Sequence, residues 1–65
     1  MNADQKYWTI KAMEAFGGGF ESALAGAYAR ADHNNSVRIE AAFPEMLAEY
    51  GPGSKFYERV FATVA

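Results

Sequence analysis

The chain has 65 residues, no cysteine, one histidine and a net charge of −2. This length allows a single domain, and the lack of cysteine excludes disulfides, iron–sulfur clusters and zinc–thiolate sites. A lone His33 also excludes a metal site built from several histidines. Hydrophobic residues make up 51% of the chain, too many for a disordered segment. We therefore expect one small globular domain over residues 1–65, without a metal or another cofactor.

The hydrophobic half of the chain consists mainly of alanine and of aromatic residues, ten of which are Phe, Tyr or Trp. Alanine lets helices approach closely, and aromatic rings fill the remaining space. In a chain this short, apolar burial only about offsets the entropy cost of folding. Tyr and Trp are also frequent at protein interfaces. The composition therefore predicts that the domain binds another protein, which is either a second copy of the chain or a different protein.

The first two predicted helices cover residues 4–16 and 20–31. We expect Asp4 to cap the first helix, and Gly17–Gly19 to end it in the left-handed conformation that glycine tolerates. The second helix carries a regular apolar stripe, whose members follow helical spacing: Phe20, Leu24, Ala27, Tyr28 and Ala31.

The third predicted segment covers residues 36–50, with Pro44 inside it. Because a residue before proline avoids the helical region, Phe43 is expected to kink or break this segment. We favour two helices, 36–42 and 44–50, with Pro44 at the first position of the second. After Gly51–Gly53, Ser54 is expected to cap a last helix over 55–63. The sequence thus predicts an all-α, compact bundle of three to four short helices.

No motif in the chain points to catalysis. Gly17–Gly19 lacks the preceding strand and nearby basic residue of a phosphate-binding loop. His33 follows Asp32 in sequence, but adjacency alone does not orient an imidazole for acid–base catalysis. Glu45 and Glu49 share one helix face, and we interpret them as ordinary solvated side chains and not as a pair of catalytic carboxylates. We therefore predict that the protein is not an enzyme.

Nucleic-acid binding is the alternative hypothesis. The turn between the second and third segments has the outline of a helix-turn-helix, and Arg30, His33 and Arg38 are the residues that would contact nucleic acid. However, six basic residues are outnumbered by eight acidic ones, whereas nucleic-acid binding requires a concentrated positive face. We rank this alternative below protein binding.

Several short motifs over residues 8–50 form a distinctive pattern. They are Phe16-Gly17-Gly18-Gly19-Phe20, Ala23-Leu24-Ala25, Ala31-Asp32, Asn35, Arg38-Ile39, Ala41-Ala42-Phe43-Pro44-Glu45 and Tyr50. The pattern resembles small uncharacterised helical proteins encoded by bacteriophages and prophages; residues 53–65 lie outside the resemblance. It implies no catalytic residues, but it implies a phage or prophage origin and action by binding a host or phage protein.

The sequence thus favours a small protein-interaction module that also forms a homo-oligomer. The aromatic residues of the terminal helices are the easiest to share between chains, and they are the expected contacts: Tyr7, Trp8, Tyr57 and Phe61. No run approaches the ~20 apolar residues of a membrane span, and residues 1–6 lack the features of a signal peptide. We therefore expect a cytoplasmic protein without membrane contact.

Overall fold

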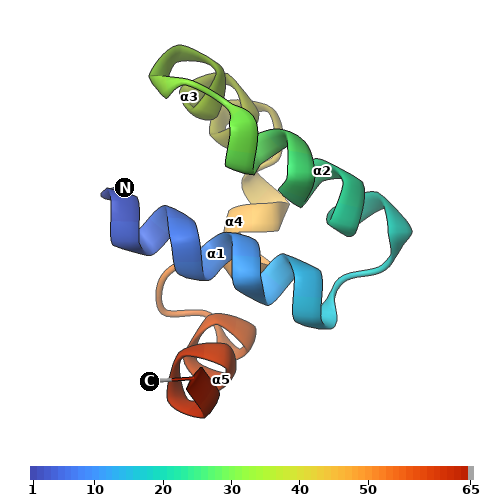
Figure 1. The fold of residues 1–65 in the computed structure, drawn as a ribbon, viewed down its shortest axis with the longest axis vertical. Helices are drawn as coiled ribbons and strands as arrows, with labels where there is room; N and C mark the ends of the chain where they lie inside the picture. The colour runs from blue at the N-terminus through green and yellow to red at the C-terminus, as the bar shows by residue number, and fades with distance from the viewer. Residues whose placement is uncertain (65) are drawn as a thin grey trace.

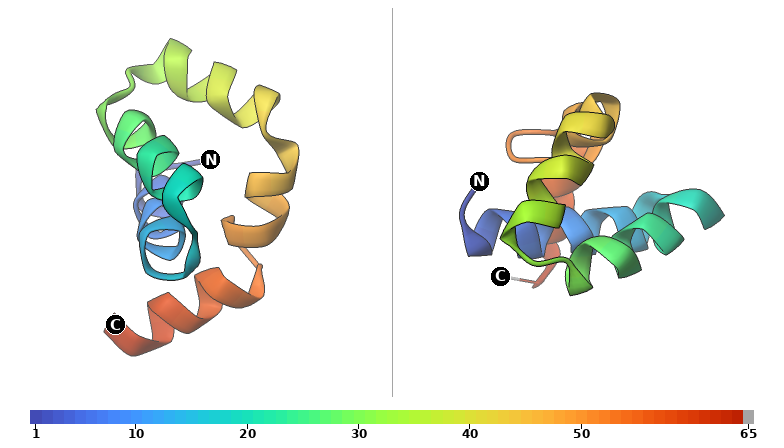
Figure 2. Two further views of the ribbon diagram at one scale, coloured as in Figure 1. Left: turned by 90° about the vertical axis from the view of Figure 1, so that its right-hand side faces the viewer. Right: turned by 90° about the horizontal axis from the view of Figure 1, so that it is seen from above.

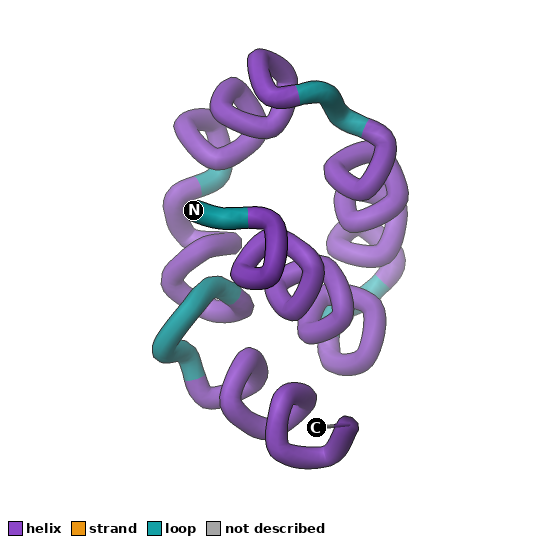
Figure 3. Tube along the Cα trace, turned by 60° about the vertical axis from the view of Figure 1, so that its left-hand side comes forward, coloured by secondary structure: helices purple, strands orange, loops and turns teal. Residues whose placement is uncertain are grey.

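The computed structural model describes residues 1–64. Within them the chain forms five helices and no strand: α1 (Ala3–Phe16), α2 (Gly19–Arg30), α3 (His33–Ala42), α4 (Pro44–Tyr50) and α5 (Lys55–Val64). Short loops join consecutive helices (Figure 3). The predicted all-α class is confirmed. The predicted number of three to four helices was slightly too low, because it counted residues 36–50 as one segment although a break at Phe43 was favoured.

Helix α1 is the centre of the fold and packs on α2, α4 and α5. In Figure 1 it lies between α2 above and α5 below. The left-hand view of Figure 2 shows the rest of the path: α3 crosses the top, α4 descends on the side opposite α1 and α2, and α5 returns below them. The first and last helices therefore lie side by side, with extensive contact between them.

The two ends of α1 differ from the sequence prediction. Asn2, not Asp4, is the N-cap: its side chain accepts a hydrogen bond from the Gln5 N–H at 2.8 Å, and Gln5 Oε1 accepts one from the Asn2 N–H at 3.0 Å. This reciprocal pair satisfies two backbone donors at once. At the other end, Gly17 has φ −84°, so the predicted left-handed ending was wrong.

Close packing explains why glycine occupies position 17. A Cβ atom there would lie 2.5 Å from the carbonyl oxygen of Met13 and would overlap the side chain of Glu21. The connection between α1 and α2 is therefore tight enough to leave no room for a side chain. Gly53 is the glycine with positive φ, +85°, and it lies in the loop before α5.

Helix α3 begins earlier than the predicted residue 36. Asp32 is its N-cap, and Asp32 Oδ1 accepts a hydrogen bond from the Asn35 N–H at 2.8 Å. A carboxylate in this position satisfies an otherwise unpaired donor and complements the positive end of the helix. His33, which lies before the predicted start of this helix, is the first residue of α3.

Phe43 breaks the third segment rather than kinking it. Its backbone, with φ −128° and ψ 65°, is not helical, and it serves as both the C-cap of α3 and the N-cap of α4. Pro44 takes the first helical position of α4, as predicted. Ser54 caps α5 as expected, since its hydroxyl accepts a hydrogen bond from the Tyr57 N–H at 3.2 Å.

The core is small and lies around α1. The buried hydrophobic residues of the described chain are Ile10, Ala12, Met13, Ala25, Tyr28, Met46, Tyr50 and Val60. Thr9 is also fully buried, and its hydroxyl donates to the Gln5 carbonyl at 2.7 Å. The predicted stripe of α2 is only partly buried, because Tyr28 points into the core whereas Phe20 is 61% exposed.

Candidate functional site

Three aromatic rings from the two terminal helices form a surface that we call the aromatic face: Tyr7, Trp8 and Phe61. Tyr7 and Trp8 meet at nearly right angles, with ring centroids 5.0 Å apart. Trp8 meets Phe61 of α5 edge-on at 5.2 Å. Tyr7 is 50% exposed and Phe61 44% exposed, so the face presents large apolar area to solvent on both sides of the tryptophan.

Tyr57, the fourth predicted contact residue, is half-buried. Within the described residues it takes part in none of the close ring pairs that link α1 to α5. The neighbouring Phe56 instead stacks on Phe16 of α1, with centroids 4.7 Å apart. The structure therefore unites Tyr7, Trp8 and Phe61 and leaves Tyr57 outside the aromatic face.

A charged stripe of α1 continues the aromatic face. The Lys11 ammonium lies 5.3 Å from the centre of the Tyr7 ring and 3.8 Å from a carboxylate oxygen of Glu14. Tyr7, Lys11 and Glu14 also line a shallow depression of about 380 Å³, together with Ala3, Lys6, Ile10 and Ala29. The exposed Tyr7 ring, the Lys11 ammonium and the Glu14 carboxylate thus follow one another along one face of α1.

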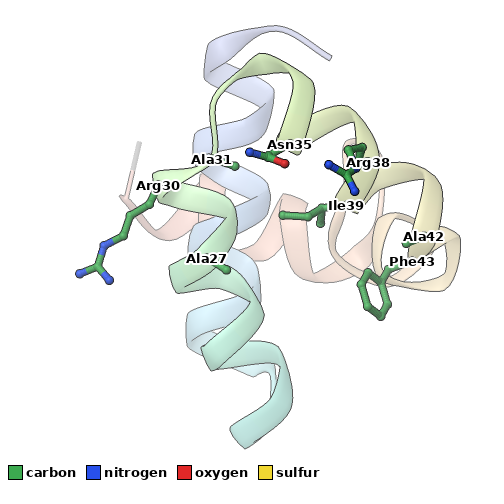
Figure 4. Close-up of a pocket in the computed structure, with 8 residues that line it drawn as sticks. All are labelled: Ala27, Arg30, Ala31, Asn35, Arg38, Ile39, Ala42 and Phe43. Carbon is green, nitrogen blue, oxygen red and sulfur yellow. The ribbon is translucent and has the colours of Figure 1, made fainter.

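A second surface lies between α2 and α3, and we call it the α2–α3 groove. It has a volume of about 550 Å³ and is lined by Ala27, Arg30, Ala31, Asn35, Arg38, Ile39, Ala42 and Phe43. Figure 4 shows Asn35, Arg38 and Ile39 along the α3 side, whereas the Arg30 side chain extends outward from the α2 edge. The structure therefore brings two of the three predicted nucleic-acid contacts to one groove.

His33, the third predicted nucleic-acid contact, lines a different surface. It is exposed and lies in a depression of about 250 Å³ that also includes Lys6, Ser36, Glu40 and the chain start. Because His33 is not among the residues of the α2–α3 groove, the three residues do not form one basic surface.

The same part of the molecule contains a polar cluster that the sequence did not predict. Lys6 Nζ donates to Ser36 Oγ at 2.8 Å and to the Ala31 carbonyl at 3.1 Å. It also lies 5.1 Å from the centre of the Tyr28 ring. The Tyr28 hydroxyl in turn donates to Glu40 at 2.5 Å. No local motif could have identified this cluster, because its members come from three helices.

The arrangement of the cluster is that of a structural connection. A serine beside a lysine is a catalytic pair only when the amine is neutral and able to take the hydroxyl proton. Here Lys6 Nζ is the hydrogen-bond donor to both Ser36 Oγ and the Ala31 carbonyl, and it lies over the Tyr28 ring. Burial of Tyr28, with Glu40 accepting its hydrogen bond, raises the pKa of the phenol above its ordinary value.

The described residues show no group of three or more His, Asp or Glu side chains arranged to hold a metal ion. Among them, no helix has both the length and the apolar character needed to cross a membrane. Comparison of the chain with models of protein families, with curated proteins and with solved structures finds no match.

Proposed function

We propose that the protein is a non-catalytic protein-interaction module that associates with a second copy of itself through the aromatic face. The observation that carries the proposal is the exposure of Tyr7 and Phe61 on either side of Trp8. Large half-exposed rings are costly in water and are enriched at protein interfaces. Covering them with another chain removes this apolar area from solvent.

The charges beside the aromatic face favour a second copy as the occupant. In a symmetric dimer the same surface of both chains meets, so it has to be complementary to itself. The stripe of α1 meets this requirement because it carries both Lys11 and Glu14 next to Tyr7. When two such stripes run antiparallel, Lys11 of each chain approaches Glu14 of the other.

The exposed surface area of the molecule indicates what fraction of the surface such an interface covers. The described chain exposes 4095 Å², and a standard interface takes about 800 Å² from each partner. This is about a fifth of the surface, more than three rings supply. The interface therefore includes the α1 stripe from Ala3 to Glu14 as well as the aromatic face.

An action by binding agrees with the placement of the polar residues. His33 is exposed and lies away from the groove that holds Arg30 and Arg38. Lys6 acts as a hydrogen-bond donor that ties α1 to Ser36 of α3 and to the Ala31 carbonyl. The phage or prophage origin and the cytoplasmic location stay predictions.

Trp8 provides a direct test, because it is the only tryptophan of the chain and lies in the aromatic face. On dilution of the protein, dissociation of the dimer exposes Trp8 and shifts its emission to longer wavelength. Lys11→Glu places an acid where the partner presents Glu14, so this variant should show the dilute spectrum at higher concentration. Lys55→Glu makes the same charge change at an exposed position at the start of α5 and serves as the control. A spectrum independent of concentration in the wild type contradicts self-association.

A further inference from the structure

One apolar side of α2 has no partner within the described chain. The predicted stripe of this helix divides: Tyr28 enters the core, whereas Ala27 and Ala31 line the α2–α3 groove. Phe20, at the start of the same helix, is 61% exposed and touches only the edge of the groove through Phe43, at a centroid distance of 5.7 Å. Burial inside the monomer therefore accounts for Tyr28 and for Leu24, which packs against the core, but not for Phe20 and Ala27.

The groove also has a distinct charge. Arg38 lines it from α3 and Arg30 from α2. Neither arginine takes part in the ion pair found among the described residues, which is Lys11–Glu14. The lining thus carries two cations and no acidic residue, in a protein whose net charge is −2.

We propose that the α2–α3 groove binds an acidic amphipathic helix of another protein. Apolar side chains of that helix would rest on Ala27, Ile39 and Phe43, and its carboxylates would pair with Arg38 and Arg30. Arginine suits this role because its planar guanidinium binds a carboxylate through two parallel hydrogen bonds. The inference does not depend on self-association, because the groove and the aromatic face share no residue.

The dimensions of the groove fit a short helix. Its lining includes Ala31 at the α2–α3 junction and Phe43 between α3 and α4, and the Phe43 ring lies beside that of Phe20. At 1.5 Å per residue, α2 spans about 16 Å between Phe20 and Ala31. A bound helix of about three turns presents apolar side chains at positions i, i+4 and i+7 over that length.

The lining of the groove favours such a helix over nucleic acid. A phosphate backbone requires several cations on one face, whereas Arg30 and Arg38 are separated by alanines and by Ile39. Apolar groups at the floor contribute nothing to phosphate contacts. They do bury the leucine or phenylalanine side chains of a peptide.

The test uses the full chain and two synthetic helical peptides of about three to four turns. Both carry leucine at i, i+4 and i+7, but one has glutamate and the other lysine at the flanking positions. Amide and methyl NMR shifts of the labelled protein report where each peptide binds. We expect the glutamate peptide to shift signals of Ala27, Ala31, Arg38, Ile39 and Phe43, without shifting those of Tyr7 and Phe61.

Charge-reversed variants complete the test. Arg38→Glu should weaken binding of the glutamate peptide about three- to tenfold, as expected for loss and reversal of a partly exposed charge pair. Lys55→Glu, which makes the same charge change outside the groove, should leave binding unchanged. The proposal is overturned if neither peptide shifts the groove signals, if the lysine peptide binds as well as the glutamate peptide, or if duplex DNA shifts those signals at lower concentration than either peptide.

Discussion

Trp8 in α1 and Phe61 in α5 meet edge-on, with ring centroids 5.2 Å apart and ring planes at 72°. The contact joins the first helix of the chain to the last. It is one of the contacts that hold α5, which within the described residues packs on α1 and α4. It also brings together residues far apart in sequence, which has an entropic cost. The same two rings belong to the aromatic face, through which we propose that the protein associates with a second copy of itself.

Phe61→Ala should loosen α5. Because Phe61 is 44% exposed, we expect a loss of about 1–2 kcal/mol in the free energy of unfolding, below the roughly 3–5 kcal/mol of a fully buried phenylalanine. Phe20→Ala is the matched control, since Phe20 is more exposed and touches Phe43 alone among the described rings. Urea unfolding at low protein concentration, followed by circular dichroism, measures both values. Equal losses would show that the Trp8–Phe61 contact does not stabilise α5.

Glycine patterns in the sequence located the turns but not their physical cause. The break after residue 16 was predicted from a left-handed ending, whereas the structure has Gly17 in extended backbone because Met13 and Glu21 leave no space for a side chain. Local propensity identifies where a helix ends, but a close approach depends on how the next helix packs. The burial of Thr9 likewise depends on how the helices pack, so the sequence did not predict it.

Two substitutions in the connection between α1 and α2 distinguish close packing from a left-handed backbone as the reason for its glycines. Gly17→Ala should destabilise the protein by more than about 1 kcal/mol, because the added Cβ overlaps backbone and side-chain atoms. Gly19→Ala adds a Cβ that meets nothing within 4 Å at the start of α2, so its effect should be neutral or slightly stabilising. Thermal unfolding of both variants measures the difference. Similar behaviour of the two variants would contradict the tight packing at position 17.

The Lys6 cluster predicts that a single ammonium group holds α1, α2 and α3 together. Lys6→Met keeps the aliphatic stem but removes the donor to Ser36 Oγ, and it leaves the Ala31 carbonyl with only the long 3.4 Å hydrogen bond from Ser36 Oγ. We expect a loss of about 1–3 kcal/mol in unfolding free energy. Lys55→Met, at an exposed position, should cost less than about 0.5 kcal/mol. Should Lys6→Met prove as mild as Lys55→Met, the hydrogen bonds of Lys6 would not stabilise the fold.

Tyr28 predicts loss of stability at alkaline pH. Its pKa is raised in the folded protein by burial and by Glu40, so the folded state retains the phenol proton when the unfolded state has lost it. This contribution is complete below about pH 10, the ordinary tyrosine value, and declines as pH rises further. Burial also raises the pKa of Tyr50, which adds to the decline.

Tyr28→Phe isolates the contribution of Tyr28. This variant keeps the ring but removes the titrating hydroxyl, so its unfolding free energy should fall less steeply than that of the wild type above about pH 10. Tyr50 remains in both proteins and accounts for the residual slope. Denaturant unfolding over a series of alkaline pH values measures the two slopes. If they coincide, Tyr28 does not hold its proton in the folded state.

The sequence predicted part of the candidate sites, because the rest depends on how the helices pack in three dimensions. Aromatic residues of the terminal helices were expected at an interface, and the structure unites Tyr7, Trp8 and Phe61. Periodicity cannot tell which side of an apolar stripe the fold covers, so the exposure of Phe20 and the α2–α3 groove appeared only in three dimensions. Closeness in sequence was also a poor guide, because His33 lines a different depression from the groove that Arg30 and Arg38 line.

Sedimentation equilibrium of the wild type and two variants tests self-association through the aromatic face most directly. We expect the wild type to show a monomer–dimer equilibrium within about 10 µM to 1 mM, the range of a modest interface. Tyr7→Ser should be monomeric over this range, whereas Phe20→Ser, which also removes an exposed ring but outside the aromatic face, should dimerise like the wild type. A wild type that stays monomeric throughout, or equal dimerisation of Tyr7→Ser and wild type, would contradict the account.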